Sequence, residues 1–171
     1  MMPEIALNIL DVAENPVRAG AKVVTITVEI DEAADTLGVT IADDGCGMSE
    51  EQTAHVTDPF FTTRTTRTVG LGVPFFKQAA ELSGGSFSIV SRLGEGTAVH
   101  AVFGLRSIDR MPLGDVSGVI HDLVTFHPEC LLHLSVQRKG IHHGHAPVPR
   151  GAGRRALGHA GGFGLYRCIS A

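Results

Sequence analysis

A carboxylate followed by two alternating glycines is the first feature of this sequence that could do chemistry. Asp43 begins the stretch DDGCGM (43–48), directly behind the apolar, β-branched run 37–42. Such a run predicts a buried strand that ends in an acid, on a backbone too small to block an approaching ligand. No Lys or Arg is adjacent to Asp43, so a ligand could supply its donor, and the exocyclic amine of adenine is suitable. An ordinary Asp-Gly turn is the alternative.

Polar side chains on the first predicted helix, from Ile5 to about Ala19, form a second candidate. At 100° per residue, Asn8, Asp11, Asn15 and Arg18 share one face. Two amides, a carboxylate and a guanidinium suit a metal ion, a water and a phosphate, although a solvated face is the alternative. A proline at position 16 is expected to kink this helix or to end it beside Asn15.

The aperiodic segment 57–72 is the third candidate. It runs DPFF (58–61), then hydroxyls and arginines (62–68), then VGLG (69–72), and a helix is predicted from Val73 to Ser83. Free amides at a helix N-terminus favour anions, so we expect a lid over phosphate here. A polar loop without that role is the alternative.

The elements that would position these candidates are predicted from periodicity. Strands are expected at 22–30 and 37–42 as a hairpin, and at 86–91 and 97–103 around a glycine-rich turn. Helices are expected from an N-cap at Ser49 to about Val56, and from a cap at Asp115 to Phe126, where Pro128 stops the helix. We interpret the last helix as core packing or a partner surface.

The four patches, in this order, resemble the GHKL ATPase superfamily, in particular its histidine-kinase ATP-binding domain. The patches are the Asn-bearing helix, DxGxG, DPFF followed by GLG, and GxGT at 94–97, and the resemblance covers about residues 4–104. It implies the Bergerat fold: an α+β, two-layer α/β sandwich with a mixed, mostly antiparallel sheet and helices on one face. ATP and Mg²⁺ are the implied cofactors.

The resemblance also assigns roles. Asn15 matches the residue that holds Mg²⁺ at the phosphates, and Arg18 matches a residue that contacts phosphate. Asp43 matches the acceptor of the adenine amine, and Thr97 matches the residue that supports the adenine through a water molecule. Asp11 stands where some members carry a catalytic base, a role that a shorter acid leaves open. The expected ATP-binding set is Asn15, Arg18, Asp43, Gly45, Gly47, Met48, Phe60, Thr63, Arg64, Gly70, Leu71, Gly72 and Thr97.

Charge changes abruptly along the chain of 171 residues. The last acid is Glu129; the net charge is −10 up to it and +6 after it. From about residue 132 periodicity is lost, so we expect three parts: an ATP-binding domain (1–106), an amphipathic helix extension (107–130) and a disordered basic tail (131–171) that an out-of-frame reading could explain. A functional basic tail that binds an acidic partner or RNA is the alternative. Nucleic-acid binding is disfavoured because the tail has only Phe163 and Tyr166 as aromatics.

The expected function is Mg²⁺-dependent ATP binding that serves phosphotransfer to a separate partner protein in signalling. A nucleotide-gated interaction module with slow or no hydrolysis is the alternative. Three widely spaced cysteines and no apolar run of membrane-spanning length favour a cytoplasmic protein without membrane contact. No helical hairpin with a phosphoacceptor His precedes position 5, so we expect a stand-alone module.

Overall fold

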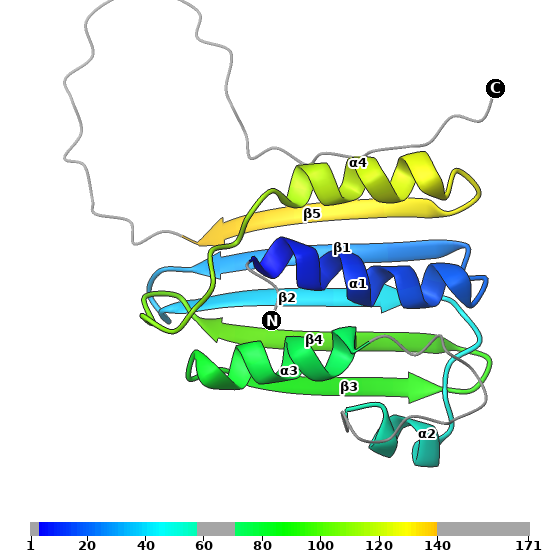
Figure 1. Cartoon of the computed structure of the whole chain (residues 1–171), viewed down its shortest axis with the longest axis horizontal. Coiled ribbons are helices and arrows are strands. Elements are labelled where there is room, and N and C mark those ends of the chain that lie inside the picture. The colour runs from blue at the N-terminus through cyan, green and yellow to red at the C-terminus, as the bar shows by residue number, and fades with distance from the viewer. Residues whose placement is uncertain (1–3, 58–70, 140–171) are drawn as a thin grey trace, which may run out of the picture.

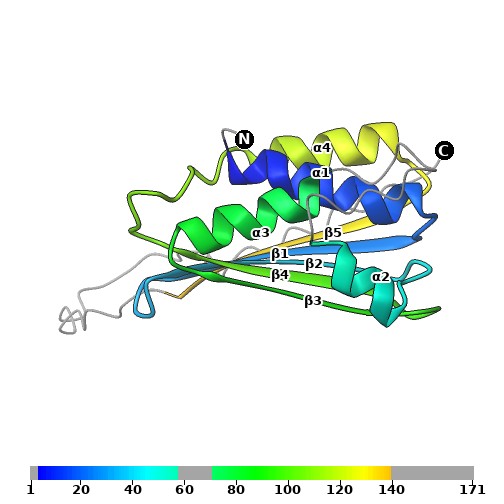
Figure 2. The same ribbon diagram turned by 60° about the horizontal axis from the view of Figure 1, so that its bottom comes forward.

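The computed structural model describes residues 4–57 and 71–139, which form a sheet covered on one face by helices (Figure 1). The five strands lie in the order β3-β4-β2-β1-β5. Figure 2 shows α1, α3 and α4 on the same side of this sheet. The elements are α1 (Ile5–Arg18), β1 (Val23–Asp31), β2 (Thr36–Asp43), α2 (Glu50–His55), α3 (Gly72–Leu82), β3 (Ser86–Arg92), β4 (Gly96–Gly104), α4 (Val116–Phe126) and β5 (Leu131–Lys139).

The predicted hairpin of β1 and β2 forms the centre of the sheet. The strands are antiparallel and bring Val24 opposite Asp43. Val24, Ile26 and Val28 are fully buried beneath the helices, because alternate side chains of a strand point to the same face. Strand β4 pairs antiparallel with β2 and with β3. The sheet is therefore mixed and mostly antiparallel, and the predicted α+β class is confirmed.

The expectation of a disordered tail from residue 131 is wrong for its first nine residues. Strand β5 pairs in parallel with β1, so that Leu132 lies opposite Val24. Leu132 is 1% exposed and belongs to the core. A parallel neighbour needs a crossover connection, and the chain between β1 and β5 ends with α4, which leads from β4 into β5. Residues 140–171 lie outside the described part of the chain.

Helix α1 continues past the position where the sequence suggested it could end. Pro16 lies inside the helix, which runs on to Arg18. Proline cannot donate to the preceding turn, but its own carbonyl accepts the N–H of Ala21 at 2.9 Å. Val17, one residue later, is 7% exposed. Burial of the apolar face therefore holds the last turn in spite of the lost hydrogen bond.

The remaining predicted caps are present. Ser49 accepts the N–H of Gln52, whose side chain in turn accepts the N–H of Ser49, and this capping box begins α2. Asp115 accepts the N–H of Gly118 at the start of α4. Over the described ranges, none of the helices is both long and apolar enough to span a bilayer.

Candidate nucleotide-binding cleft

One cleft opens between α1 and the ends of β2, β3 and β4. Its volume is about 390 Å³, within the range of small-molecule sites. The walls are mostly apolar, which suits a flat base. The cleft is lined by Val12, Asn15, Pro16, Ala19, Ile41, Asp43, Cys46, Gly47, Met48, Gln52, Val56, Val73, Ile89, Thr97 and Val99. Of the expected ATP-binding residues, it therefore brings together Asn15, Asp43, Gly47, Met48 and Thr97.

Asp43 is the acidic group of the cleft, at the last position of β2. Its Oδ1 accepts the backbone N–H of Gly45 at 2.8 Å. Burial raises the pKa of this carboxyl, while hydrogen bonds from the backbone of Gly45 and Thr97 oppose the rise. A partly desolvated acceptor is stabilised by a further donor. Because the walls beside it are apolar, an exocyclic amine of a bound base fits this position.

Beside the cleft, two loops pack backbone against backbone. A Cβ at Gly47, whose φ is +64°, would lie 1.9 Å from the carbonyl oxygen of Arg92. A Cβ at Gly96 would lie 2.0 Å from the carbonyl oxygen of Asp43. The N–H of Gly94 donates to the carbonyl of Cys46 at 2.8 Å. Gly47 and Gly96 therefore allow the close contact between the turn 92–96 and the loop 43–47, which a side chain at either position would open.

Ser91 connects these loops and was missed by sequence reasoning. Its hydroxyl oxygen accepts the N–H of Met48 and lies 2.8 Å from Oγ1 of Thr97. Thr97 pairs directly with Asp43 across the β2–β4 ladder. The chain Met48–Ser91–Thr97 thus fixes the Thr97 hydroxyl beside the acid. A serine in a predicted strand carries no sequence signal for this role. Gln52 and Val56 also line the cleft. They were missed because the sequence of a short polar helix carries no signal for a role in binding.

The polar face predicted for α1 is divided in the structure. Asn15 lines the cleft, but Asn8 is 1% exposed and lines a different cavity. Arg18 is largely exposed and forms an ion pair with Glu14 on the same helix. The expectation that these side chains form one surface for metal and phosphate is therefore wrong. The cause is that α3 packs against α1 and covers the part of the face that holds Asn8.

Asp11 lies beside the start of α3. A Cβ at Gly72 would lie 2.6 Å from Oδ2 of Asp11, so glycine lets the helix start beside this carboxylate without displacing it. Leu71 is the N-cap of α3 and is 45% exposed. Gly45 does not line the cleft, but its N–H donates to Asp43, which does. The expected ligands Phe60, Thr63, Arg64 and Gly70 lie outside the described residues.

Comparison with known proteins identifies the domain. The profile of the family described as "Histidine kinase-, DNA gyrase B-, and HSP90-like ATPase" matches residues 2–107. The chain belongs to this family. Residues 2–107 are therefore a histidine-kinase-like ATPase domain, which binds ATP. The match ends before α4, so α4 and β5 lie beyond the family's segment.

Relatives of this ATPase domain include signalling kinases. The chain is 35% identical over 77 residues to the C4-dicarboxylate transport sensor protein DctB of Pseudomonas aeruginosa, covering 43% of this chain and 13% of that protein. It is 26% identical over 106 residues to sporulation kinase C of Bacillus subtilis, covering 62% of this chain and 24% of that protein. The chain thus spans no more than a quarter of either relative.

A solved structure is also similar. The catalytic domain of histidine kinase ThkA, in a nucleotide-free form, aligns with a TM-score of 0.48 and 22% identity. The alignment covers 61% of this chain and 68% of that one.

Proposed function

We propose that the protein binds ATP together with Mg²⁺ and transfers its γ-phosphoryl group to a separate protein in a signalling pathway. The observation that supports this most is the placement of Asn15 and Asp43 in one cleft, from α1 and β2. A base donor would lie at Asp43, and the triphosphate would extend toward Asn15 and the start of α3. Membership of the ATPase family and the kinases among the relatives support the same activity.

The cleft fits a magnesium ion that is held mainly by the nucleotide. Mg²⁺ prefers oxygen ligands and is commonly bound by one or two side chains together with substrate phosphates. Asn15 supplies an amide oxygen at the cleft wall. Within residues 4–57 and 71–139, no group of three or more His, Cys, Asp or Glu side chains is arranged to hold a metal. Bound Mg²⁺ would neutralise phosphate charge, and Asn15 would orient it.

The phosphoryl acceptor is proposed to come from outside the cleft. The described residues that line the cleft include no histidine, and we assign the polar side chains of Asn15, Asp43 and Thr97 to nucleotide binding. Family relatives named as sensor proteins or kinases supply the signalling context. A protein partner that presents an acceptor side chain at the mouth of the cleft fits both facts.

The test is transfer of labelled γ-phosphate from ATP to a protein that co-purifies with the full chain. Label should appear on the co-purified protein with wild type and not with Asp43→Asn. Label on the partner that is equal for the variant and the wild type would contradict phosphotransfer from this cleft.

A second candidate is a nucleotide-gated interaction module with slow or no hydrolysis. It is favoured by one observation: Asp11, the expected base, is packed against Gly72 and does not line the cleft. In this case ATP would strengthen partner binding and the label would remain on the nucleotide. Partner affinity measured with ATP, with a non-hydrolysable analogue and without nucleotide separates the two candidates, because a module responds equally to both nucleotides.

A further inference from the structure

Ser91 lies behind the nucleotide cleft and contacts two of the residues that line it. Thr97 and Met48 line the cleft, whereas Ser91 does not. Ser91 stands directly opposite Thr97 in the pairing of β3 with β4, and Thr97 stands directly opposite Asp43 in the pairing of β4 with β2. Residues directly opposite each other carry their side chains on the same face of a sheet. Asp43, Thr97 and Ser91 therefore form one polar row across three strands.

The hydrogen bonds of the Ser91 hydroxyl use each of its bonding positions. A serine hydroxyl has one proton to donate and two lone pairs that accept. The Ser91 hydroxyl accepts the N–H of Met48 at 2.8 Å and donates to the carbonyl of Gly96 at 3.1 Å. Its oxygen also lies 2.8 Å from Oγ1 of Thr97. Because the single Ser91 proton goes to Gly96, Thr97 has to be the donor in this last bond.

The Thr97 hydroxyl therefore meets the cleft as an acceptor. Its proton is directed at Ser91, outside the cleft, and its remaining lone pair is available to a ligand. The neighbouring Asp43 carboxylate is also an acceptor when it is ionised. Ile41 and Val99, the opposed pair two residues further along the same strands, line the cleft with apolar surface. One edge of the cleft thus has two acceptors next to an apolar wall.

A base that lies against this wall would present its edge to the two acceptors. The amine at C6 of adenine is a donor, whereas the carbonyl at C6 of guanine or hypoxanthine is an acceptor. We propose that Ser91 is a positioning residue that holds Thr97 as an acceptor, so that the cleft selects a purine with an amine at C6 over one with a carbonyl there. A water between Thr97 and the amine transmits the same preference, because it donates to Thr97 and accepts from the amine. This role of Ser91 rests on ATP binding in the cleft, which is the first step of the proposed function.

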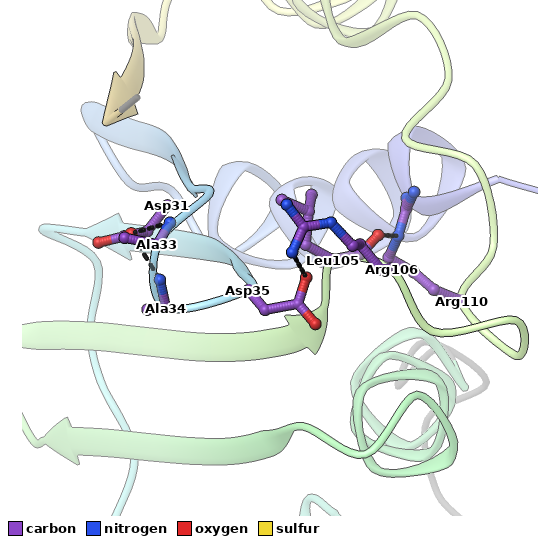
Figure 3. A network of polar contacts seen from close by, with 7 residues as sticks. All are labelled: Asp31, Ala33, Ala34, Asp35, Leu105, Arg106 and Arg110. Carbon is purple, nitrogen blue, oxygen red and sulfur yellow. Dashed lines mark hydrogen bonds and ion pairs between the residues drawn. The ribbon is translucent and has the colours of Figure 1, made fainter. Parts of the chain in front are cut away.

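Contacts at the far end of the same strands keep β2 and β4 in register. The N–H of Leu105, just after β4, donates to the carbonyl of Asp35, just before β2, at 2.9 Å. The Arg106 guanidinium lies 3.3 Å from the Asp35 carboxylate (Figure 3). A slip by one residue would move every side chain of a strand to the other face. Since these contacts do not involve Ser91, loss of its hydroxyl should leave the polar row in register.

The nucleotide selectivity of the full chain tests this role. The two probes are the β,γ-methylene analogues of ATP and of ITP, which carry adenine and hypoxanthine, and calorimetry measures both affinities. Wild type should bind the ATP analogue more tightly. In Ser91→Ala the Thr97 hydroxyl can turn and donate to a carbonyl, so the ratio of the two affinities should fall about twofold to tenfold, as expected for one hydrogen bond. Ser91→Thr keeps the hydroxyl and should keep the wild-type ratio.

A double-mutant cycle separates this role from a purely structural one. Loss of the Ser91 hydroxyl also leaves the Met48 N–H without its acceptor, which would weaken both nucleotides by the same factor. Thr97→Val removes the hydroxyl that Ser91 is proposed to orient, so adding Ser91→Ala to Thr97→Val should leave the ratio unchanged. The control is Ser88→Ala, which removes an exposed hydroxyl from the same strand and should change neither affinity.

Three results would overturn the positioning role while leaving ATP binding intact. The first is an equal loss of affinity for both nucleotides in Ser91→Ala. The second is a further fall in the ratio when Ser91→Ala is added to Thr97→Val. The third is a ratio in Ser91→Thr as low as that in Ser91→Ala. A wild-type chain that binds neither analogue would contradict the proposed function itself, and the role of Ser91 with it.

Discussion

Asp43 and Asp44 are neighbours in sequence whose carboxyl pKa values are displaced in opposite directions. Burial raises the pKa of Asp43. The backbone N–H groups of Val23 and Lys22, each donating to Oδ1 of Asp44 at 2.8 Å, lower the pKa of Asp44. The Asp43 carboxylate thus lines the cleft and loses hydration there. The Asp44 carboxylate stabilises the contact between the start of β1 and the loop 43–47. The proposed role in ligand binding falls to Asp43, while the adjacent acid Asp44 contributes to stability.

The variant Asp43→Asn should have a lower affinity for ATP and should still fold. The amide can still accept the N–H of Gly45, but it removes the charged acceptor for the adenine amine. Affinity for a non-hydrolysable ATP analogue should fall about tenfold to a hundredfold, equivalent to about 1–3 kcal/mol. Isothermal titration calorimetry measures this, with circular dichroism to check folding. Unchanged affinity in the folded variant would remove Asp43 from the site.

The same two acids should give opposite dependences of stability on pH. Because folding raises the pKa of Asp43, its contribution is complete below the ordinary value near 4 and is lost as pH rises through the folded value. Folding lowers the pKa of Asp44, so its contribution is present above that value and is lost as pH falls through the folded pKa.

Melting temperatures of the two amide variants test these signs. At about pH 7, Asp43→Asn should raise the melting temperature and Asp44→Asn should lower it. Both differences from wild type should shrink as the pH falls below about 4, where the native carboxyls become protonated. If the melting temperature shifted in the same direction in both variants at neutral pH, the opposite effects assigned to the two carboxylates on stability would be wrong.

Asn15→Ala should weaken ATP binding mainly when Mg²⁺ is present. The amide oxygen is proposed as a ligand of the ion, so its loss should matter little in EDTA. Affinities for the ATP analogue measured under both conditions give the difference. Equal losses with and without the metal would mean that Asn15 acts on the cleft wall and not on the ion.

Gly47→Ala should separate the loop 43–47, which lines the cleft, from the turn 92–96. Its Cβ would lie 1.9 Å from the carbonyl oxygen of Arg92, so the turn 92–96 has to move away. Gly94→Ala is a matched control, since Gly94 also has a positive φ, +79°, but has open space around it. The control should cost about 1–2 kcal/mol of backbone strain. Gly47→Ala should cost more and also weaken ATP, as urea denaturation and calorimetry would show.

The position of β5 leads to a prediction about truncation. A chain that ends at Pro128 lacks the strand whose Leu132 is buried against β1, and should melt at a clearly lower temperature. A chain that ends at Lys139 keeps this strand and should match the full chain in melting temperature and ATP affinity. Loss of ATP binding by the longer truncation would show that residues 140–171 contribute to the domain.

Much of the fold could be predicted because local patterns and packing agree. Val24, Ile26 and Val28 alternate with polar residues, and their burial follows from that alternation alone. The strand β5 was missed although it carries the same local signal, because Leu132, Leu134 and Val136 alternate with His133, Ser135 and Gln137. The pattern is short, and the change in charge and composition that follows it led us to assign the whole segment to the tail. Its partner β1 lies about a hundred residues earlier, and local sequence carries no sign of that pairing.

The site was predictable to a similar extent. A motif could indicate Asp43 and Thr97, because each stands at a strand end beside glycines. Helical spacing placed Asn8 with Asn15, but spacing does not show which part of a face a second helix covers. Ser91 acts through a hydrogen bond to Met48, 43 residues away, which the pairing of β4 with both β2 and β3 brings within reach.

The parallel pairing of β5 with β1 also has a consequence for synthesis. The elements that line the cleft end with β4 at Gly104, but β1 remains an unpaired edge until Lys139 has left the ribosome. Open edges pair readily with other chains, and strand contacts distant in sequence form slowly. A stalled or truncated nascent chain would therefore contain the elements of the ATP cleft while the edge of β1 is still open to pairing with other chains.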